Sequence, residues 1–491
     1  MIAPWVQEEM QHTDLQDKRL NRRLEQILSN LGDRPTLSIP AACGGHKEMT
    51  AAYRFFNNQK ASWDGILASH RESTIRRARN QKKIALVADT TEVDLTRPTQ
   101  QVADVGPLDS TARFGLHLHA MEAFTLEGLA LGEVWSQVWA RGKESLKIPQ
   151  EFKRKKRKTS PIEKKESFRW LEGLQQGRAF AQLCPDTQCV YVADSEADIF
   201  ELFVEPRGEI NPVHWVIRFC QDRATLPTSQ ESEEEEGVAP GRLIREQVLV
   251  TKVLFTKEIS VRGRKAKVSC EDRRRRQPRH DRKAVVEVRA TTLRLRPPWR
   301  SDRKLAEVSV NVVMVSEVNP PADDVAVEWV LLTTLPIETV EQVQEVIQFY
   351  VVRWMGEILF RTLKSGCRVE QRRLETKERM VAALAVYLIV AWRTLYVCHL
   401  GRNCPEMSCE AVFEPSEWKS VWITVEGKRP PKKPPGLANM VRLIAQLGGY
   451  VNRPNRKDPP GPQTVWIGLQ RMHDLAWAWD VFGPGANKKD V

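Results

Sequence analysis

Four residues of one segment have the types and spacing to hold a nucleic-acid backbone beside a metal ion. The segment reads FYVVRWMGEILFRTLKSG, and the four are Tyr350, Arg353, Glu357 and Lys364. At about 100° of turn per helical residue they fall on one stripe roughly 60° wide. The segment lacks proline and meets Ser365-Gly366 after Lys364, which predicts one helix ending there. A carboxylate beside three phosphate-holding groups can place a divalent cation against a phosphodiester.

Two aspartates can supply the further carboxylates that a catalytic magnesium site needs. IALVAD ends a short apolar run at Asp89, and CVYVAD ends another at Asp194. Both runs predict buried strands, and carboxylates at strand ends can converge. If these strands share one sheet and the predicted helix packs at its edge, Asp89, Asp194 and Glu357 form one acidic pocket. Such a pocket would bind two Mg²⁺ ions about 3.5–4 Å apart and drive in-line attack on a phosphodiester.

Each of these acidic residues also has a purely structural interpretation. Asp89 and Asp194 fit N-caps or turn formers, which aspartate favours after strands. Glu357 fits a solvated helix residue with Arg353 and Lys364 as neighbours on an exposed face. The joint order of carboxylates and phosphate-holding groups favours the functional interpretation.

In this order the motifs resemble those of DDE transposases of the insertion-sequence-four family, the cut-and-paste members with a Tyr-x2-Arg-x3-Glu-x6-Lys signature. The resemblance covers nearly the whole chain, through DKRLNRRL, AAYRFFNN, VADTTEVDL, VADSEADIF, EWVLLTTLPIET, the signature and LIAQLGGY. It implies that Asp89, Asp194 and Glu357 are the catalytic triad that binds two Mg²⁺ ions, which Mn²⁺ can replace. No position of the pattern is substituted.

The same resemblance implies DNA contacts. Tyr350, Arg353 and Lys364 fall on residues that contact DNA phosphates. Trp329 aligns with a tryptophan that stacks near a base flipped out of the DNA end, although it also fits an ordinary core tryptophan at a strand start. Arg218, in HWVIRF, aligns with an arginine near the cleavage point, and only the alignment separates it from a surface arginine.

The implied activity is cut-and-paste transposition of an insertion sequence. A nick frees a 3′-hydroxyl, which attacks the opposite strand to make a hairpin; the hairpin is reopened, and the 3′ end is joined to target DNA. The implied partners are transposon-end DNA, target DNA and a second copy of the chain in a synaptic complex. Two other classes stay open: a metal-dependent nuclease that cuts without joining, and a catalytically silent DNA-binding regulator of transposition.

The expected fold class is α/β. The resemblance implies a ribonuclease-H-like core interrupted by a β-strand insertion, with helical domains at both ends. Residues 1–77 are expected to form a helical DNA-end-binding domain, in which Arg22 and Arg23 recur at helical spacing with Arg19. Residues 78–400 are expected to form the catalytic domain and 401–491 a helical dimerisation domain.

Two stretches inside these predicted domains have open interpretations. The stretch between Asp194 and Glu357 is too long for a simple connection. REQVLVTKVLF, KAVVEVRATTLRLR and AEVSVNVVMVSEV predict strands there, in an insertion at about 207–335. In the C-terminal domain, four apolar residues fit either a dimer interface or the intramolecular core: Trp466, Leu469, Met472 and Leu475.

Bulk composition agrees with a nucleic-acid partner. Lys and Arg outnumber Asp and Glu by 75 to 63, giving a net charge of +12 and a pI near 9.3. A ribosome-associated or membrane-surface protein can show the same excess. No apolar run approaches the roughly 20 residues of a transmembrane helix, and Met1 to Gln11 lacks an apolar signal core, so we expect a soluble, cytoplasmic protein. The resemblance implies a bacterial protein associated with the nucleoid.

Several other features are assigned ordinary roles. The nine cysteines are odd in number and lack paired short spacings, which indicates reduced thiols. Cys398, Cys404 and Cys409 with His399 match no standard zinc site. His117 and His119 alternate along one predicted strand and are expected to be structural. The cationic run at 153–158 fits either a solvated loop or a non-specific DNA contact.

Overall fold

The computed structural model describes residues 2–99, 101–109, 112–142, 144, 160–226, 242–261, 263, 279–322, 324–451 and 459–483. The cationic run at 153–158 lies outside them. The chain divides into two compact units, each described by itself. The first unit contains Met1–Gln150, Leu183–Thr187 and Trp354–Val491, and the second contains Glu151–Gln182 and Gln188–Arg353.

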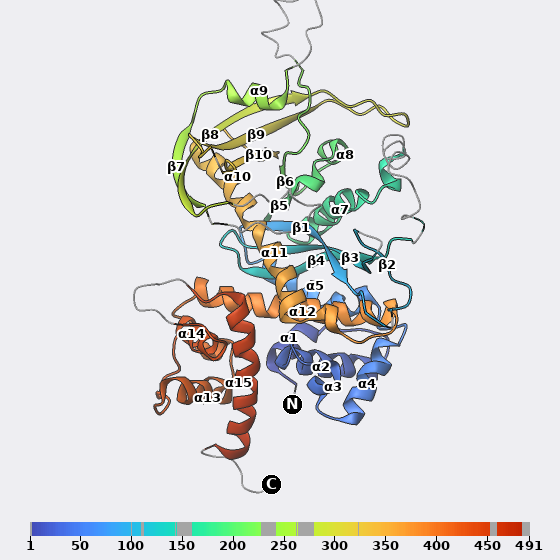
Figure 1. Ribbon diagram of the computed structural model, residues 1–491, viewed down its shortest axis with the longest axis vertical. Coiled ribbons are helices and arrows are strands. Elements are labelled where there is room, and N and C mark those ends of the chain that lie inside the picture. The colour runs from blue at the N-terminus through green and yellow to red at the C-terminus, as the bar shows by residue number, and fades with distance from the viewer. Residues whose placement is uncertain are drawn as a thin grey trace, which may run out of the picture. The chain divides into compact units, whose positions relative to one another are not determined.

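The first unit begins with five helices, drawn in blue in Figure 1: α1 (Pro4–Met10), α2 (Lys18–Asp33), α3 (Ile39–Cys43), α4 (His46–Phe56) and α5 (Trp63–Ala78). The Asp17 carboxylate accepts the Arg19 backbone N–H at 2.8 Å and so caps α2. The Ser62 hydroxyl accepts the Gly65 N–H at 3.1 Å and caps α5. Helices α2 and α5 therefore each begin at a side chain that satisfies an otherwise unpaired N–H group.

A buried polar network ties α1 to α5 and to the sheet. The His70 Nε2 atom accepts the Glu133 backbone N–H at 3.1 Å, so Nδ1 carries the ring proton and donates it to Glu9 at 2.7 Å. Arg77 also pairs with Glu9, and Arg71 makes a two-point contact with Glu133 at 2.7 and 2.9 Å. These pairs fix the N-terminal helices against the sheet because each buried carboxylate has a cationic partner.

The sheet of the first unit is antiparallel. Strand β3 (Phe114–Phe124) pairs with β1 (Lys83–Asp94), β2 (Gly106–Pro107) and β4 (Ala130–Trp139). The buried run of β1 ends before Asp89, as predicted, but the strand itself continues to Asp94. The β-branched residues Thr90, Thr91 and Val93 favour this extension. Asp89 therefore lies within its strand, opposite Ala120, and not at the strand's end.

The second unit is built on a mixed sheet in the order β5-β6-β10-β9-β8-β7. Its strands are β5 (Gln188–Ala193), β6 (His214–Arg218), β7 (Phe255–Val261), β8 (Arg282–Leu295), β9 (Val308–Glu317) and β10 (Glu328–Thr333). β5 and β6 are parallel, and the other pairs are antiparallel. The α/β class is confirmed.

One predicted strand of this unit is wrong over nearly its whole length. REQVLVTKVLF begins inside helix α9 (Ile244–Leu249), and only its last residue, Phe255, lies in β7. The Glu246 side chain accepts the Leu243 backbone N–H at 3.1 Å, which caps a helical turn that β-propensity does not foresee. The other helices of the unit are α7 (Phe168–Leu183), α8 (Phe200–Phe203) and α10 (Val340–Val352).

Helix α12 (Lys377–Asn403) is the core helix of the first unit. It contacts α2, α4, α5, β4 and α14 (Leu437–Leu447). It is also long and apolar enough to cross a membrane, so our prediction that no apolar run approaches that length is wrong. Of its most apolar window, 83% is buried inside the protein, as in the core helix of a globular domain.

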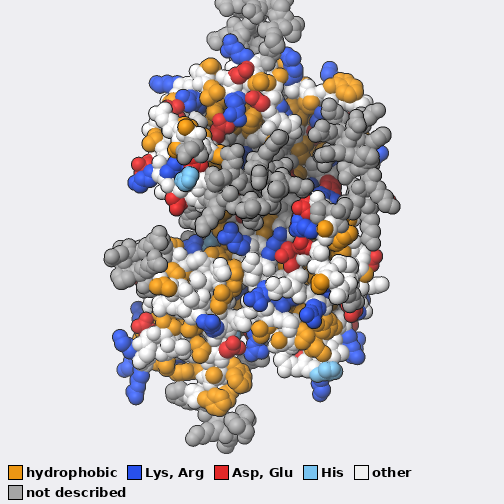
Figure 2. Space-filling model, in the orientation of Figure 1, with side chains coloured by type: hydrophobic (Ala, Val, Ile, Leu, Met, Phe, Trp, Pro, Cys, Tyr) orange, Lys and Arg blue, Asp and Glu red, His pale blue; other side chains and the backbone are white. Residues whose placement is uncertain are grey.

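The C-terminal helices are α13 (Pro415–Glu426), α14 and α15 (Pro462–Phe482). Trp466 and Met472, two of the four candidates for an apolar interface, are buried in the core of the first unit, and Leu469 and Leu475 are half-buried. The exposed aromatic residues of α15 are Trp477 and Phe482, at 63% and 75% exposure. Figure 2 shows hydrophobic side chains gathered over the C-terminal end of α15.

An ion-pair centre at His473 joins α15 to α13 and α2. Its Nδ1 lies 3.2 Å from Glu417 Oε1, and its Nε2 lies 3.6 Å from Asp33 Oδ1. Burial alone would lower the pKa of His473, but the nearby carboxylates outweigh burial and hold that pKa above its ordinary value of 6.5. The imidazolium form is thus favoured by the fold.

We predict that this centre makes stability depend on pH. A raised native pKa means that the stabilisation is fully present below about pH 6.5 and is lost as pH rises through the native pKa. In urea unfolding at pH 6 and pH 8.5, His473→Gln should lose less stability with rising pH than the wild-type chain. His46→Gln, at an exposed histidine, is the control. Equal pH dependence in wild type and His473→Gln would contradict the assignment.

Candidate functional site

The signature segment is not one α-helix. α10 ends at Val352, α11 runs from Trp354 to Arg361, and a π-helical turn follows at Thr362–Gly366. In that turn the Cys367 N–H donates to the Thr362 carbonyl at 2.8 Å, five residues back. The wider turn changes the direction around the helix axis in which Lys364 lies. The prediction that all four residues share one stripe of a single helix is therefore wrong at Lys364.

Helix α11 packs closely on β1 at Gly356. A Cβ atom built there would lie 3.2 Å from Val87 Cγ1 and 3.8 Å from Asp89 Cβ. The absence of a side chain lets the backbone that carries Glu357 approach the aspartate of β1. Asp89 and Glu357 are both half-buried. The structure therefore brings the helix that carries Glu357 into contact with the strand that carries Asp89, within the first unit.

Buried neighbours fix the strand around Asp89. Its Oδ1 atom accepts the Thr90 N–H at 2.7 Å, and the Thr90 hydroxyl contacts His119 Nδ1 at 2.8 Å. His119 packs edge-on against Trp135 with ring centroids 5.7 Å apart, and His117 stacks on Trp139. Both histidines are buried within the strand layer, as predicted. Sequence reasoning missed that His119 positions the residue next to Asp89.

Lys364 lies among carboxylates that we did not single out. Its Nζ is 3.8 Å from Glu370 Oε1. Burial lowers the pKa of Lys364, while the charges of Glu370, Glu92 and Asp94 oppose that shift. Arg113 pairs with Asp94 at 2.9 Å and with Glu92 at 3.2 Å. The sequence pattern that could have revealed these carboxylates is VADTTEVDL, where two acidic residues follow Asp89 in the strand.

Asp194 belongs to the second unit, directly after β5. Its Oδ1 atom accepts the Glu196 N–H at 2.8 Å and caps the 3₁₀ turn Ser195–Ala197. The structural role that aspartate favours after strands is therefore present. The cap uses one oxygen of the half-buried Asp194 carboxylate, and it fixes the orientation of that carboxylate relative to β5.

A cluster around Tyr350 surrounds Asp194 within the second unit. The Trp329 and Tyr350 rings meet edge-on with centroids 5.6 Å apart, and the Arg353 guanidinium lies 5.7 Å from the Tyr350 ring. Burial raises the pKa of the Tyr350 phenol, the positive charges of Arg353 and Arg218 oppose this, and the Asp194 charge adds to it. Five predicted site residues thus meet around one phenol.

The remaining predicted residues lie elsewhere. Arg22 is exposed and Arg23 half-buried on α2, and neither belongs to the clusters around Asp89 or Tyr350. The eight cysteines of the described residues are free thiols. The Nδ1 atom of His399 is hydrogen-bonded to the Gly128 carbonyl.

The described residues contain no group of three Asp, Glu, His or Cys side chains that could hold a metal ion. The carboxylates present nevertheless have the oxygen ligands that Mg²⁺ and Mn²⁺ prefer. The contact of α11 with β1 at Gly356 joins the two elements that carry Asp89 and Glu357, and the carboxylates of these two residues are ligands of the type that fits a hard divalent cation.

Comparison with known families identifies the chain. Residues 141–393, more than half of the chain, match the family described as Transposase DDE domain. The chain belongs to the DDE transposases. Residues 2–61 of this transposase match Transposase DNA-binding, and residues 389–478 match Transposase Tn5 dimerisation domain. Asp194 and Glu357 lie inside the DDE match, and Asp89 lies before it.

Among solved structures, the transposase is similar to the "Cryo-EM structure of piggyBac transposase synaptic complex with hairpin DNA" at a TM-score of 0.30 and 8% sequence identity. The similarity covers 83% of this chain and 60% of that chain, so the transposase spans less than two thirds of its neighbour. A TM-score this low establishes no detail of fold or mechanism.

We predict that Gly356→Leu destabilises the transposase by about 1–3 kcal/mol, because the new side chain must enter the contact with Val87 and Asp89. Arg361→Leu, at an exposed position of the same helix, should change stability by less than about 0.5 kcal/mol. Urea unfolding of both variants measures the difference. Equal stability in the two variants would show that α11 does not need this close contact.

Proposed function

We propose that this chain is a cut-and-paste transposase of the insertion-sequence-four type, with a ribonuclease-H-like core, in which Asp89, Asp194 and Glu357 act as one catalytic triad. The packing of α11 on β1 carries the proposal, because in this DDE transposase the helix that carries Glu357 contacts the strand that carries Asp89 at Gly356. The cap formed by Asp194 supports its part, since the cap holds a carboxylate at the end of β5.

The triad would hold two divalent ions, Mg²⁺ or Mn²⁺, through carboxylate oxygens. When bound, the ions supply Lewis-acid stabilisation of the charge that develops on the attacking and leaving oxygens. The protein fixes the carboxylates in advance. Asp89 is held by its neighbour Thr90, Asp194 by its turn, and Glu357 by the glycine contact of α11.

The cluster at Tyr350 would position the DNA backbone. Arg218 and Arg353 present guanidinium groups beside the Tyr350 phenol, and such a fork can hold a phosphate at two points. Lys364 would add a point charge from the first unit, in competition with Glu370. Correct placement of the scissile phosphate relative to the carboxylates contributes to the rate because it replaces a random encounter by a fixed geometry.

The order of DNA events follows from the type of enzyme proposed. A first nick frees a 3′-hydroxyl, the hydroxyl attacks the opposite strand to close a hairpin, water reopens the hairpin, and the 3′ end is joined to target DNA. Trp329, half-buried beside Tyr350, would stack with the base that leaves the helix as the hairpin closes. Stacking on an aromatic ring offsets lost base stacking by about 1–3 kcal/mol.

Two copies of the chain would hold two transposon ends. The dimerisation-domain match at 389–478 supports this proposal, and so do the exposed Trp477 and Phe482 of α15. Large aromatic side chains on a surface are enriched at protein interfaces. The helical segment at 2–61, with the exposed Arg22, would bind the specific end sequence.

We predict that Glu357→Gln and Asp194→Asn each abolish nicking and hairpin formation on a labelled duplex from the chain's own flanking element, with Mg²⁺ present. Binding of that duplex should stay within about threefold of wild type, because the isosteric amides remove charge and leave the fold intact. The control is Glu307→Gln, at an exposed carboxylate of the second unit that pairs with Arg294.

Three outcomes would contradict the proposal. Cleavage by both amide variants would show that Asp194 and Glu357 are not catalytic residues. Specific binding by the wild-type chain without any cleavage in Mg²⁺ or Mn²⁺ would favour a silent DNA-binding regulator. Cleavage without joining to a target duplex would favour a nuclease.

We also predict that Trp329→Ala slows hairpin formation roughly tenfold more than the first nick, because only the hairpin step needs a stacked, displaced base. Trp329→Phe should recover most of the loss. Denaturing gels that resolve nicked and hairpin products over time measure both steps. Equal slowing of the two steps would show that Trp329 only supports Tyr350.

A further inference from the structure

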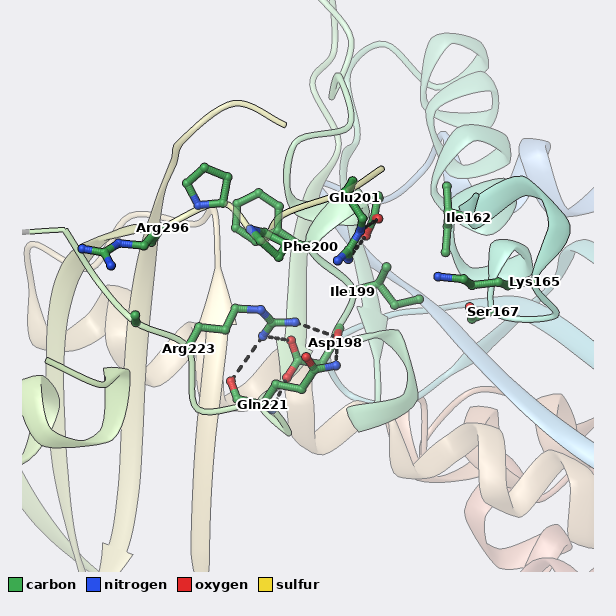
Figure 3. A pocket seen from close by; sticks show the side chains of 14 residues that line it. Ile162, Lys165, Ser167, Asp198, Ile199, Phe200, Glu201, Gln221, Arg223 and Arg296 are labelled. Carbon is green, nitrogen blue, oxygen red and sulfur yellow. Dashed lines mark hydrogen bonds and ion pairs between the residues drawn. The ribbon is translucent and has the colours of Figure 1, made fainter. Parts of the chain in front are cut away.

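A pocket of about 400 Å³ lies in the second unit, within the size range of small-ligand sites (Figure 3). The segments that follow β5 and β6 supply Asp198 and Gln221 to its lining, and the turn after β8 supplies Arg296 and Arg300. β5 and β6 are parallel neighbours. Ligands of parallel sheets bind beyond the carboxyl ends of the strands, which is where this pocket lies.

The lining is cationic overall. It contains Lys165, Arg223, Arg296 and Arg300 against two carboxylates, Asp198 and Glu201. Both carboxylates are already engaged: Arg223 pairs with Asp198, and Arg300 contacts Glu201 at two points, 2.6 and 3.2 Å. The local excess of positive charge suits a phosphate group.

Two cations of the lining, Lys165 and Arg296, form no ion pair with a carboxylate in the part of the chain that the structure describes. Burial raises the pKa of Glu201, but Arg300 and, less strongly, Lys165 hold that pKa below its ordinary value. Figure 3 shows Lys165 extending toward Ile199 and Asp198, with Arg296 on the opposite side and pointing away. Of the two, Lys165 is therefore the cation whose charge faces the pocket.

Trp299 stands between two lining residues, Pro298 and Arg300, with 82% of its surface exposed. The segment that carries it is fixed on both sides. The Arg296 N–H donates to the Ala224 carbonyl at 3.0 Å, two prolines follow, and Arg300 is held by Glu201. An indole held in water by a stiff segment is the kind of platform on which an unpaired base stacks.

We propose that this pocket and Trp299 bind a single-stranded stretch of DNA, with a phosphate at Lys165 and an unpaired base on the Trp299 ring. A base inside a duplex has both faces covered, so an isolated indole selects an unstacked one. Trp299 lies outside the pocket lining, so the two contacts suit a strand better than a free nucleotide. Asp198 lies only four residues after Asp194, so the strand would pass beside the proposed catalytic carboxylate; this location rests on the proposed function.

The test measures strand binding without cleavage. The full-length chain is titrated in EDTA against a labelled 12-nucleotide oligothymidylate, with fluorescence anisotropy as readout. We expect Trp299→Ala to weaken binding roughly tenfold and Trp299→Phe to restore most of it. Lys165→Gln should reduce the slope of log affinity against log salt by about 0.7. Ile210→Ala and Arg294→Gln, at exposed positions outside the pocket, should bind as wild type.

A strand containing 5-bromodeoxyuridine, crosslinked by ultraviolet light, should attach to the peptide that contains Trp299. Unchanged affinity of Trp299→Ala and Lys165→Gln, or a crosslink confined to other peptides, would overturn the proposal. Competition by free thymidine monophosphate at concentrations equal to those of the oligonucleotide would show that the pocket binds a free nucleotide. That result would overturn the proposal that a DNA strand binds there.

Failure of the pocket proposal can be distinguished from failure of the proposed function. Loss of strand binding in Trp299→Ala with no cleavage by the wild-type chain would contradict only the transposition mechanism. Normal nicking and hairpin formation with unchanged strand binding in Trp299→Ala would contradict only the pocket.

Discussion

The close approach of α11 to β1 at Gly356 is the contact on which the candidate chemistry depends. A Cβ atom there would already lie 3.2 Å from Val87 Cγ1, so a large side chain has no room between the helix and the strand. The helix is held from its other end by the π-helical turn, which leads through Cys367 into α12. A rigid core helix and a missing Cβ together set the position of Glu357, so the reactive geometry is a result of packing as much as of the acidic residues themselves.

The two units differ in how they hold their functional side chains. In the first unit, Asp89 and Lys364 lie among ion pairs and buried histidines that leave them little freedom. In the second, Asp194 and the groups at Tyr350 are arranged on strands and on the end of α10. The chain passes from one unit to the other between Arg353 and Trp354, inside the signature itself. Arg353, which we propose binds a phosphate, and Glu357, which we propose is catalytic, thus lie on opposite sides of that boundary, four residues apart.

Local pattern was enough to foresee the α/β class and the strands that carry Asp89 and Asp194, because short apolar runs predict buried strands well. Local pattern failed where a specific tertiary or capping contact determines the local structure. Glu246 caps a helix in a segment whose β-branched residues predict a strand. The π-helical turn at Thr362–Gly366 depends on a five-residue hydrogen bond that no periodicity reveals. The carboxylates around Lys364 come together from β1 and from Glu370 far along the chain, which pattern alone cannot pair.

The burial of α12 has a consequence for how the chain is made. This helix packs against the apolar faces of α2, α4 and α5, yet it begins about 300–345 residues after they end. Translation at about 5–20 residues per second leaves those faces without their partner for roughly 15–75 seconds. The N-terminal helices emerge first but complete their core only when residue 403 has left the ribosome. Molecular chaperones therefore have a long interval in which to act on the nascent chain, and a ribosome that stops early releases a fragment whose first helices cannot pack.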